Sequence, residues 1–311
     1  MKNKSAKIPL LGVAAEPTGW CQRGKEMIFE CHGHIILDGV SYKSAIARHR
    51  NGIDEDFVRQ NLKTCAEHGI LFYRDGGDKH GVSAFAKKIA GEFGINYRTS
   101  VFIIHKKGHY GNMFGRAFEN ISEYRELIAE ALRSGADFIK TTASGLLDFT
   151  KGGIVTEPAL TLEELRMMVN IAHGEGLAVM IHANGADNIK RAAEAGADSI
   201  EHGYYMDKQA LQIMEQTKSI WVPTCVTVSS LIGSGLYEDE MLQKILDGHK
   251  EMLIAAASCG VQIACGSDAG ASRIPQGKGT LDELTALQRL GIDCEPGNRA
   301  IAHLFKRRTL C

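Results

Sequence analysis

The stretch Gly176-Leu177-Ala178-Val179-Met180-Ile181-His182 carries the pattern that decides the fold. Its glycine follows an amphipathic stretch, an apolar run comes directly after the glycine, and a histidine closes the run. Glycine often ends a helix because it adopts the left-handed backbone conformation without steric cost. A short run that is apolar on both faces is typical of a buried parallel strand. The stretch therefore predicts a helix, a tight turn and a buried strand, in that order.

The same pattern recurs on both sides of this stretch, for example from Gly135 to Lys140 and from Gly196 to Ile200. Apolar residues at three- and four-residue spacing predict helices over residues 54–67, 122–133, 161–173, 188–194 and 239–258. Apolar runs predict strands near residues 27–32, 70–75, 99–104, 137–142, 177–182, 198–202, 219–223 and 261–267. Alternating strands and helices indicate a parallel sheet, and eight such units favour a closed barrel over an open sheet. The predicted fold class is therefore α/β, as a (β/α)8 TIM barrel.

The chain has 311 residues, only six prolines, and no proline-rich or low-complexity tract that would separate domains. Barrels of this class commonly reach such a length as one domain. We therefore expect an N-terminal extension over residues 1–25 and a single barrel domain over residues 26–311.

The composition excludes several classes of partner. Hydrophobic residues make up 44% of the chain, charged residues 23%, and the formal net charge is -1. Such a chain has no general attraction for nucleic acid or anionic lipid. No apolar stretch is long enough to span a bilayer or to form the core of a secretory signal. The eight cysteines form no C-x-x-C pair, which favours reduced thiols. We expect a cytoplasmic protein with a small-molecule substrate and no nucleic-acid or membrane partner, and a homo-oligomer stays open.

Residues able to bind metal stand at the ends of the predicted strands. His32 and His34 close the first strand, and residues two apart on a strand share a face. Barrel enzymes build their active sites at the carboxyl ends of their strands. We therefore predict one site that unites six side chains: His32, His34, Lys140, His182, His202 and Asp268.

Four imidazoles and a carboxylate form a donor set that suits a divalent ion such as Zn, Mn, Fe, Co or Ni. A lysine ammonium has no lone pair, but a deprotonated lysine can react with CO2 to give an anionic carbamate that bridges two cations. Taken singly, each residue has a plainer interpretation: a hydrogen-bonded core histidine, a snorkelling or Schiff-base lysine, or an aspartate that caps a helix. The combination at strand ends favours a metal site.

Five segments carry a resemblance to a known family: residues 29–34, 137–140, 180–185, 199–203 and 260–270. In this order they make the chain similar to the amidohydrolase superfamily, in its imidazolonepropionase-like and prolidase-like branch, over residues 27–290. The resemblance implies that His32, His34 and Asp268 hold one divalent metal ion, and that His182 and His202 hold a second. It also implies a carboxylated Lys140 as the bridge between the two ions. Zinc is the default choice of metal on general ligand preferences and cellular supply.

The same resemblance implies a mechanism. A metal-activated hydroxide would attack the scissile carbonyl, and Asp268 would be the catalytic general base that takes its proton. His109, in the loop after the third strand, would bind substrate, as would Asn184 and Arg273. Two departures from the family pattern stand out. Glu30 occupies a position where relatives carry aspartate, and the β-sandwich that relatives build from both chain ends is expected to be absent, with helices over residues 281–290 and 300–307.

The predicted function is hydrolysis of a C–N amide bond in a dipeptide-like or cyclic amide substrate. The lysine favours a two-metal hydrolase over the one-metal deaminases of the superfamily, which generally lack it. A lactonase or phosphoesterase stays open, because the same nucleophile attacks either centre. Two alternatives belong to other classes: a metal-free Schiff-base lyase that uses Lys140, and a non-catalytic metal-binding protein.

Overall fold

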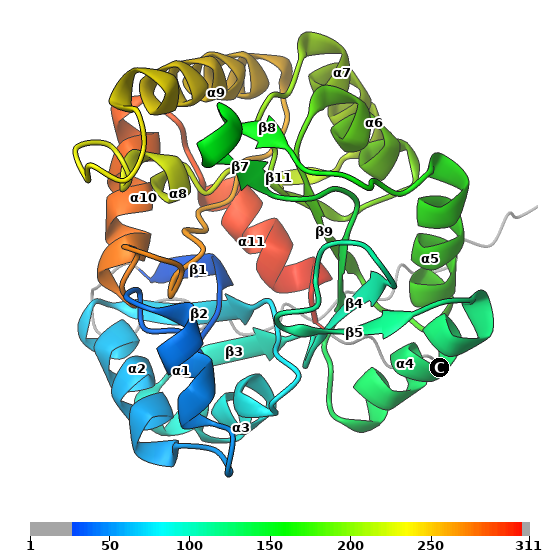
Figure 1. Cartoon of the computed structure of the whole chain (residues 1–311), viewed down its shortest axis with the longest axis vertical. Coiled ribbons are helices and arrows are strands. Elements are labelled where there is room, and N and C mark those ends of the chain that lie inside the picture. The colour runs from blue at the N-terminus through cyan, green and yellow to red at the C-terminus, as the bar shows by residue number, and fades with distance from the viewer. Residues whose placement is uncertain (1–26, 307–311) are drawn as a thin grey trace, which may run out of the picture.

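The computed structural model describes residues 27–306, in which helices surround a set of parallel strands (Figure 1). The extension predicted over residues 1–25 lies outside the described residues. The parallel strands are β1 (Ile28–Gly33), β2 (Ile70–Asp75), β3 (Asn96–Thr99), β4 (Ile103–Lys106), β5 (Gly115–Phe118), β6 (Ile139–Thr142), β9 (Val179–Ala183), β10 (Ser199–His202) and β11 (Ile220–Val222). A separate antiparallel hairpin consists of β7 (Leu147–Asp148) and β8 (Ile154–Val155).

Helices connect most of these strands. The α-helices are α1 (Tyr42–Arg48), α2 (Glu55–Glu67), α3 (Val82–Ile89), α4 (Ile121–Arg133), α5 (Leu162–Gly174), α6 (Ala186–Glu194), α7 (Lys208–Thr217), α8 (Val226–Ser229), α9 (Asp239–Cys259), α10 (Lys278–Arg289) and α11 (Glu295–Leu304). Two short 3-10 helices are η1 (Ala90–Phe93) and η2 (Phe149–Lys151). Within residues 27–306, none of the helices combines the length and the apolar character needed to cross a membrane.

Hydrogen bonds arrange the strands in two parallel sheets, with the orders β1-β2-β3 and β11-β10-β9-β6-β4-β5. Where β3 ends, the amide of Asp137 donates to the Thr99 carbonyl at 2.8 Å and links the two sheets. At the opposite side, the segment 261–267 lies between β11 and β1, and the amide of Cys31 donates to the Cys265 carbonyl at 2.8 Å. The predicted α/β class with a parallel sheet is confirmed.

The stretch around Gly176 folds as its pattern predicts. α5 begins after Thr161, whose side chain forms a capping box with Glu164. The chain leaves the helix through Gly176, which has a φ of +72°, and continues as β9, in which all five residues are buried. Helix, turn and strand thereby bring His182 to the carboxyl end of β9.

The prediction of one continuous strand over residues 99–104 is wrong. β3 ends at Thr99 and β4 begins at Ile103, and Val101 between them has a φ of +67°. The bend is stabilised because the Val101 amide donates to Thr99 Oγ1 at 2.8 Å and the Val101 carbonyl accepts from the amide of Asp78 at 2.8 Å. β-branched residues resist positive φ, so the local sequence gives no sign of this break.

The strand predicted over residues 261–267 is also wrong in its continuity. The segment forms an isolated bridge between Ile263 and Trp221 in place of an extended ladder. The amide of Cys265 donates to Asn298 Oδ1 at 2.8 Å, so a side chain of α11 takes the place of a strand carbonyl. Because Asn298 is 33 positions away from Cys265, the sequence of the segment itself could not predict this hydrogen bond.

The helices predicted over residues 281–290 and 300–307 both begin earlier, at Lys278 in α10 and at Glu295 in α11. Pro296 stands in the first turn of α11, where proline is tolerated because that amide has no helical partner. The prediction also omitted α1, α3, α7 and α8, and it gave no sign of β5 or the β7–β8 hairpin.

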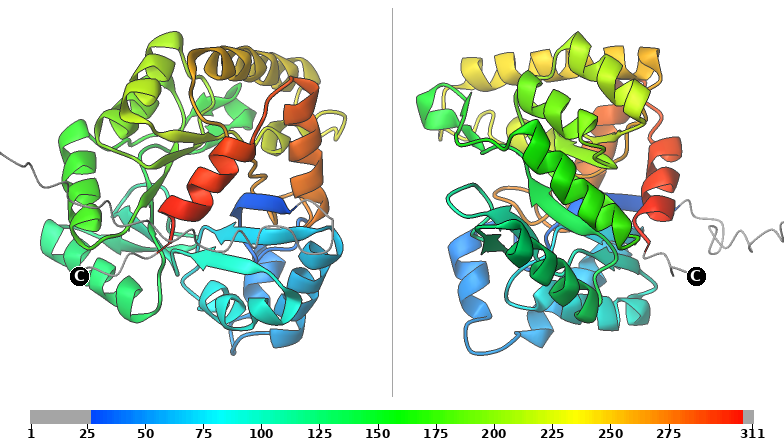
Figure 2. Two further views of the ribbon diagram at one scale, coloured as in Figure 1. Left: turned by 180° about the vertical axis from the view of Figure 1, so that it is seen from behind. Right: turned by 90° about the vertical axis from the view of Figure 1, so that its right-hand side faces the viewer.

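α11 closes the amino-terminal end of the strands. Seen from behind in Figure 2, α11 crosses in front of the strands. Its Ile301 and Ala302, with Phe305 directly after it, pack in one cluster with Phe29 on β1 and Phe138 just before β6. The rings of Phe138 and Phe305 are 5.2 Å apart. The interior is therefore mostly apolar at this end, apart from the buried guanidinium of Arg74, which lies against the ring of Phe305.

Glu283 on α10 gives the fold a pH-dependent stability. It is fully buried and accepts hydrogen bonds from the amides of Cys225 and Val226 at 3.0 and 2.9 Å. Burial raises the pKa of this carboxyl from 4.5 to about 8, so the folded state keeps a proton that the unfolded state loses. Its contribution is full below the unfolded pKa and is lost as the pH rises through the folded pKa. We expect the free energy of unfolding, measured by urea titration, to fall between about pH 5 and about pH 8, and Glu283→Gln to flatten that slope.

The matched control is Glu240→Gln, which changes an exposed carboxyl on α9 and should leave the slope unchanged. A Glu283→Gln variant with the slope of the unmodified protein would contradict the assignment of this pH dependence to Glu283.

Candidate metal centre

The six predicted side chains come together at the carboxyl ends of the strands. His32, Lys140, His182 and His202 lie on β1, β6, β9 and β10, while His34 and Asp268 directly follow β1 and the segment 261–267. All six line one cavity with a volume of about 200 Å³. The structure therefore unites every residue that the sequence singled out as a ligand.

The imidazoles and the carboxylate lie close enough to share ions. His34 Nε2 and His32 Nε2 are 3.7 and 3.8 Å from Asp268 Oδ1. The ring centroid of His202 is 4.9 Å from that of His32 and 4.5 Å from that of His182. The potential ligand atoms of His32, His202 and Asp268 all lie within 4.8 Å of one another. This spacing suits one or two ions, whose bonds to nitrogen and oxygen are about 2 Å long.

Two of these residues have a left-handed backbone, with a φ of +67° at His202 and +60° at Asp268. Non-glycine residues seldom adopt this conformation, and such strain is concentrated at functional sites. At His202 it has a direct consequence. Neighbours on a strand normally point to opposite faces, yet both Glu201 and His202 contact the ring of His32. Two consecutive residues thus serve the same site.

Lys140 is the unusual member of the group. Its side chain is buried, and its Nζ has no hydrogen-bond partner among residues 27–306. Burial lowers the pKa of this amine to about 8. A buried amine without an acceptor is costly, and a lysine with a lowered pKa has a neutral fraction that can react with CO2. The orphaned amine therefore fits a site that bound metal ions would complete.

Burial also keeps the four imidazoles neutral. It lowers the pKa of His34 to about 3 and that of His182 to about 4, and the charge of Lys140 acts in the same direction. The pKa values of His32 and His202 are lowered well below the usual range, again mainly by burial. Because neutral imidazole has a free lone pair, all four rings are in the protonation state that binds metal at neutral pH.

Asp268 keeps contact with the cavity, since its side chain is 18% exposed. Burial raises the pKa of its carboxyl to about 6, and the charge of Lys140 opposes this rise. At neutral pH the group is mostly ionised, but it holds a proton more readily than an ordinary aspartate. This combination suits a residue that both binds a cation and accepts a proton.

A buried ion pair holds His32 from the side away from the cavity. His32 Nδ1 donates to Glu201 Oε2 at 2.8 Å, and Arg74 Nη2 donates to both oxygens of Glu201 at 2.9 and 3.0 Å. A carboxylate on one ring nitrogen fixes the ring and leaves the other nitrogen free for a metal. Thr224 Oγ1 lies 2.8 Å from Nδ1 of His202 and can orient that ring in the same way. The sequence prediction missed these three partners.

Glu30 joins the two ends of the site. Its buried carboxylate accepts hydrogen bonds from the amides of His32 and Ser267, both at 2.9 Å, and from Thr280 Oγ1 at 2.6 Å. Burial raises the pKa of this carboxyl to about 7. Because Ser267 directly precedes Asp268, one side chain fixes the backbone beside two of the predicted ligands.

His109, the first predicted substrate contact, is not among the residues that line the cavity. Its ring forms a hydrogen bond with the backbone of Pro158. The next residue, Tyr110, lines the cavity instead, and its ring centroid is 4.9 Å from that of His182. The sequence marks this loop as part of the site but does not show which of the two adjacent side chains turns inward.

Asn184 and Arg273 also lie outside the cavity lining. Asn184 Nδ2 is 3.3 Å from His182 Nε2, and its Oδ1 accepts from the amide of Tyr204 at 3.1 Å. Arg273 Nε donates to the Ser230 carbonyl at 2.8 Å. Asn184 therefore supports His182, and Arg273 is engaged with the backbone. Direct substrate contact by either residue remains a prediction.

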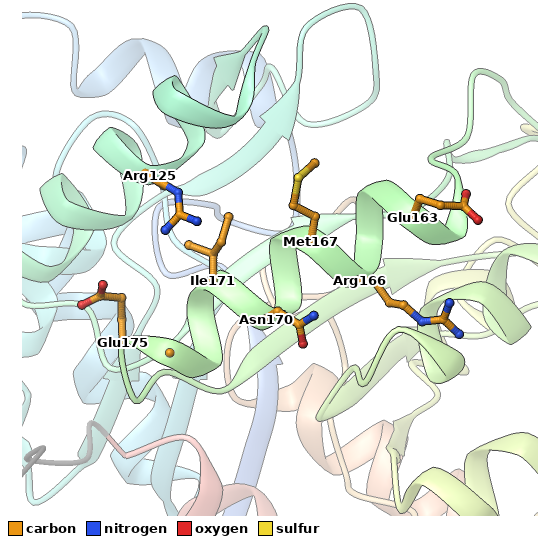
Figure 3. A pocket seen from close by; sticks show the side chains of 8 residues that line it. Arg125, Glu163, Arg166, Met167, Asn170, Ile171 and Glu175 are labelled. Atoms are coloured by element: carbon orange, nitrogen blue, oxygen red, sulfur yellow. The ribbon is translucent and has the colours of Figure 1, made fainter.

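Larger hollows lie away from this cluster. A surface groove of about 590 Å³ lies along α4 and α5. Figure 3 shows side chains that line it, among them Arg125, Arg166 and Met167. Another hollow, of about 530 Å³, lies between α8, α9 and α10 and includes Arg273. Neither contains any of the six predicted ligands. The volume of a cavity alone therefore does not identify the candidate site.

The fold and the cluster of ligands agree with the family found by comparison. Residues 47–304 match the model of the amidohydrolase family. The chain belongs to the amidohydrolase family, which confirms the resemblance seen in its sequence. The match begins after His32 and His34, so these two residues enter the site on the evidence of geometry.

Among curated proteins, the chain is similar to ochratoxinase from Aspergillus niger, with 25% identity over 236 residues, which are 74% of this chain and 45% of the relative. The chain spans about half the length of the curated relatives it matches. Among solved structures it is similar to a Xaa-Pro dipeptidase with bound methionine, with a TM-score of 0.68, 24% identity, and coverage of 90% of this chain and 75% of that one. The structure of Aspergillus niger ochratoxinase gives a TM-score of 0.69 at 22% identity, covering 88% and 68%. At these identities the solved structures support the fold.

Proposed function

We propose that this chain is a metal-dependent hydrolase that cleaves a C–N amide bond, with Asp268 as the general base. One observation carries the proposal: a single cavity is lined by six residues from distant parts of the chain, namely His32, His34, Lys140, His182, His202 and Asp268. Membership of the amidohydrolase family supports the reaction class. Similarity to proteins named ochratoxinase and Xaa-Pro dipeptidase supports an amide as the bond that is cleaved.

The proposed scaffold is one closed (β/α)8 barrel over residues 26–311, with residues 1–25 as an extension. The hydrogen bond from Asp137 to Thr99 supports closure between the two sheets, and the bond from Cys31 to Cys265 supports it at the other side. In a closed barrel the carboxyl ends of all strands form a common rim. Such a rim accounts for ligands that come from so many separate segments.

The donor set fits two zinc ions. His32, His34 and Asp268 would hold one ion, His182 and His202 the other, and a carboxylated Lys140 would lie between them. The unpartnered amine of Lys140 and the neutral imidazoles support this assignment. A divalent ion bound here would lower the pKa of water and polarise the scissile carbonyl.

The chain's own residues supply the remaining steps. Asp268 accepts the proton of the attacking water and delivers it to the leaving nitrogen. Glu201 holds the ring of His32, and Thr224 that of His202, so that each ring keeps one nitrogen free. The Gly145 carbonyl, 2.9 Å from His182 Nε2, steadies that ring together with Asn184 at 3.3 Å. Held in this way, the ligands need little rearrangement during the reaction.

Metal removal tests the proposal. We expect protein produced with ample zinc to bind about two ions per chain and to hydrolyse small amides, because only the metal-bound site can activate water at neutral pH. A chelator should abolish amide hydrolysis, and added zinc should restore it. Elemental analysis and the release of free amine measure the two quantities on the same sample.

Three outcomes would contradict parts of this proposal. Full activity in chelator would exclude the metal mechanism. Turnover of lactones or phosphoesters without turnover of any amide would change the substrate class. Bound metal without turnover of amides, esters or phosphoesters would identify a non-catalytic metal-binding protein.

A further inference from the structure

The walls of the site cavity are mostly apolar. Apart from the proposed ligands, none of the described residues that line it is charged. Its apolar wall includes Leu37, Ile103, Met113, Phe114 and Leu146. Pockets orient a bound molecule through a few polar groups on an apolar lining, and here the proposed metal-binding side chains provide most of those polar groups.

Two aromatic rings stand directly beside the proposed ligands. The ring of Phe114 stacks on His34, with centroids 4.9 Å apart and planes inclined by 20°. The ring of Tyr110 lies 4.9 Å from that of His182. Both rings belong to the connection between β4 and β5. A substrate bond that reaches the ligands therefore has an aromatic surface next to it.

The apolar lining continues to the mouth of the cavity. Tyr42 and Leu146 line the cavity and are still 46% and 44% exposed. Tyr42 lies on α1, and Leu146 directly precedes the β7–β8 hairpin. Figures 1 and 2 place α1 and this hairpin on the same side of the strands, opposite α11. Exposed apolar side chains at the edge of a cavity gain free energy when a ligand covers them.

We infer that the site takes amides whose group next to the scissile bond is uncharged, apolar and about the size of one aromatic ring, with Leu146 as a specificity-determining residue at the mouth. This inference rests on the proposed function. The cavity volume of about 200 Å³ sets the size, since an apolar cavity of about 150 Å³ holds one benzene molecule. The otherwise uncharged lining sets the polarity, because a charged group held away from the proposed metal ligands would have no charged partner on the walls.

Two substrates with a single amide bond each test the inference. N-methylphenylacetamide carries a phenyl ring beside the bond, and N-methylsuccinamate carries a carboxylate. We expect the zinc-loaded protein to hydrolyse the first with a kcat/KM at least about tenfold higher, measured as released methylamine. Equal rates, or a preference for the succinamate, would overturn the inference.

A charge-introducing variant tests the role of Leu146. Leu146→Arg should lower kcat/KM for the phenyl substrate and raise it for the succinamate, because the guanidinium can pair with the carboxylate at the mouth. The matched control is Met167→Arg, since Met167 is also 44% exposed but projects into the groove shown in Figure 3. The control should leave the ratio unchanged. A Leu146→Arg variant that behaves like the control would contradict the specificity role.

Binding measurements separate this inference from the proposed function. Calorimetric titration of the zinc-loaded protein with each compound reports the preference even without turnover. Preferential binding of N-methylphenylacetamide without hydrolysis would refute the proposed activity and support the apolar site. Hydrolysis with no preference in binding or rate would support the activity and refute the apolar site.

Discussion

Replacing Lys140 by methionine is expected to lower kcat/KM for amide hydrolysis by at least about a thousandfold, because loss of the bridging ligand removes the several kcal/mol that bound metal contributes to the reaction. Methionine keeps the length and apolar stem of lysine but has no amine to carboxylate. The bound metal should fall below that of the unmodified protein. Native mass spectrometry should show the added mass of one CO2 on the unmodified chain and not on the variant.

The matched control is Lys106→Met. Lys106 stands at the end of β4, pairs with Glu164 and does not line the cavity. It should leave activity and metal content unchanged. A Lys140→Met variant that keeps the metal content and the activity of the unmodified protein would contradict the bridging role of Lys140. If borohydride instead trapped substrate covalently on Lys140 in metal-free protein, the Schiff-base alternative would take its place.

Replacing Arg74 by methionine is expected to destabilise the protein by about 3–5 kcal/mol, because it leaves the buried carboxylate of Glu201 without its partner. Both side chains have no exposed surface, and the guanidinium donates two hydrogen bonds to the carboxylate. Since Glu201 also holds His32, metal affinity should fall by about 10- to 100-fold. Urea unfolding and competition with a chelating dye measure the two effects.

A double variant separates stability from metal binding. Arg74→Met with Glu201→Met replaces the buried ion pair by apolar side chains, and such replacements are often neutral or stabilising. We expect stability to recover while metal affinity stays low. Arg59→Met is the control on the surface, where the pair with Glu92 at 2.6 Å is exposed to water and its loss should cost far less than the loss of the buried pair. Equal losses in Arg74→Met and Arg59→Met would show that the buried pair has no special role.

The sequence predicted those candidate ligands that a local pattern can reveal. Lys140 and His182 were found because each closes an apolar run after a glycine, and such runs become strands. His202 closes a run of the same kind. This regularity explains why the fold class and the six-residue cluster could be predicted without coordinates.

The partners of the ligands could not be predicted in the same way. Glu201 was missed because it adjoins His202 and alternation places neighbours on opposite faces, whereas the φ of +67° at His202 brings both to His32. Arg74 meets Glu201 across 127 positions of sequence, and only the folded chain brings them together. Likewise, Tyr110 lines the cavity in place of His109, because a loop has no fixed period that would say which side chain faces inward.

The helix that closes the amino-terminal end of the strands also bears on the chemistry at their far end. The guanidinium of Arg74 lies 4.3 Å from the ring of Phe305, at the end of α11, and on its other side it binds the carboxylate that holds His32. Arg74 and Glu201 thus connect α11 with the proposed metal site, so looser packing of Phe305 would let water reach this buried ion pair. Substitutions on the inward face of α11 are therefore expected to affect the proposed metal site as well as the packing of the interior.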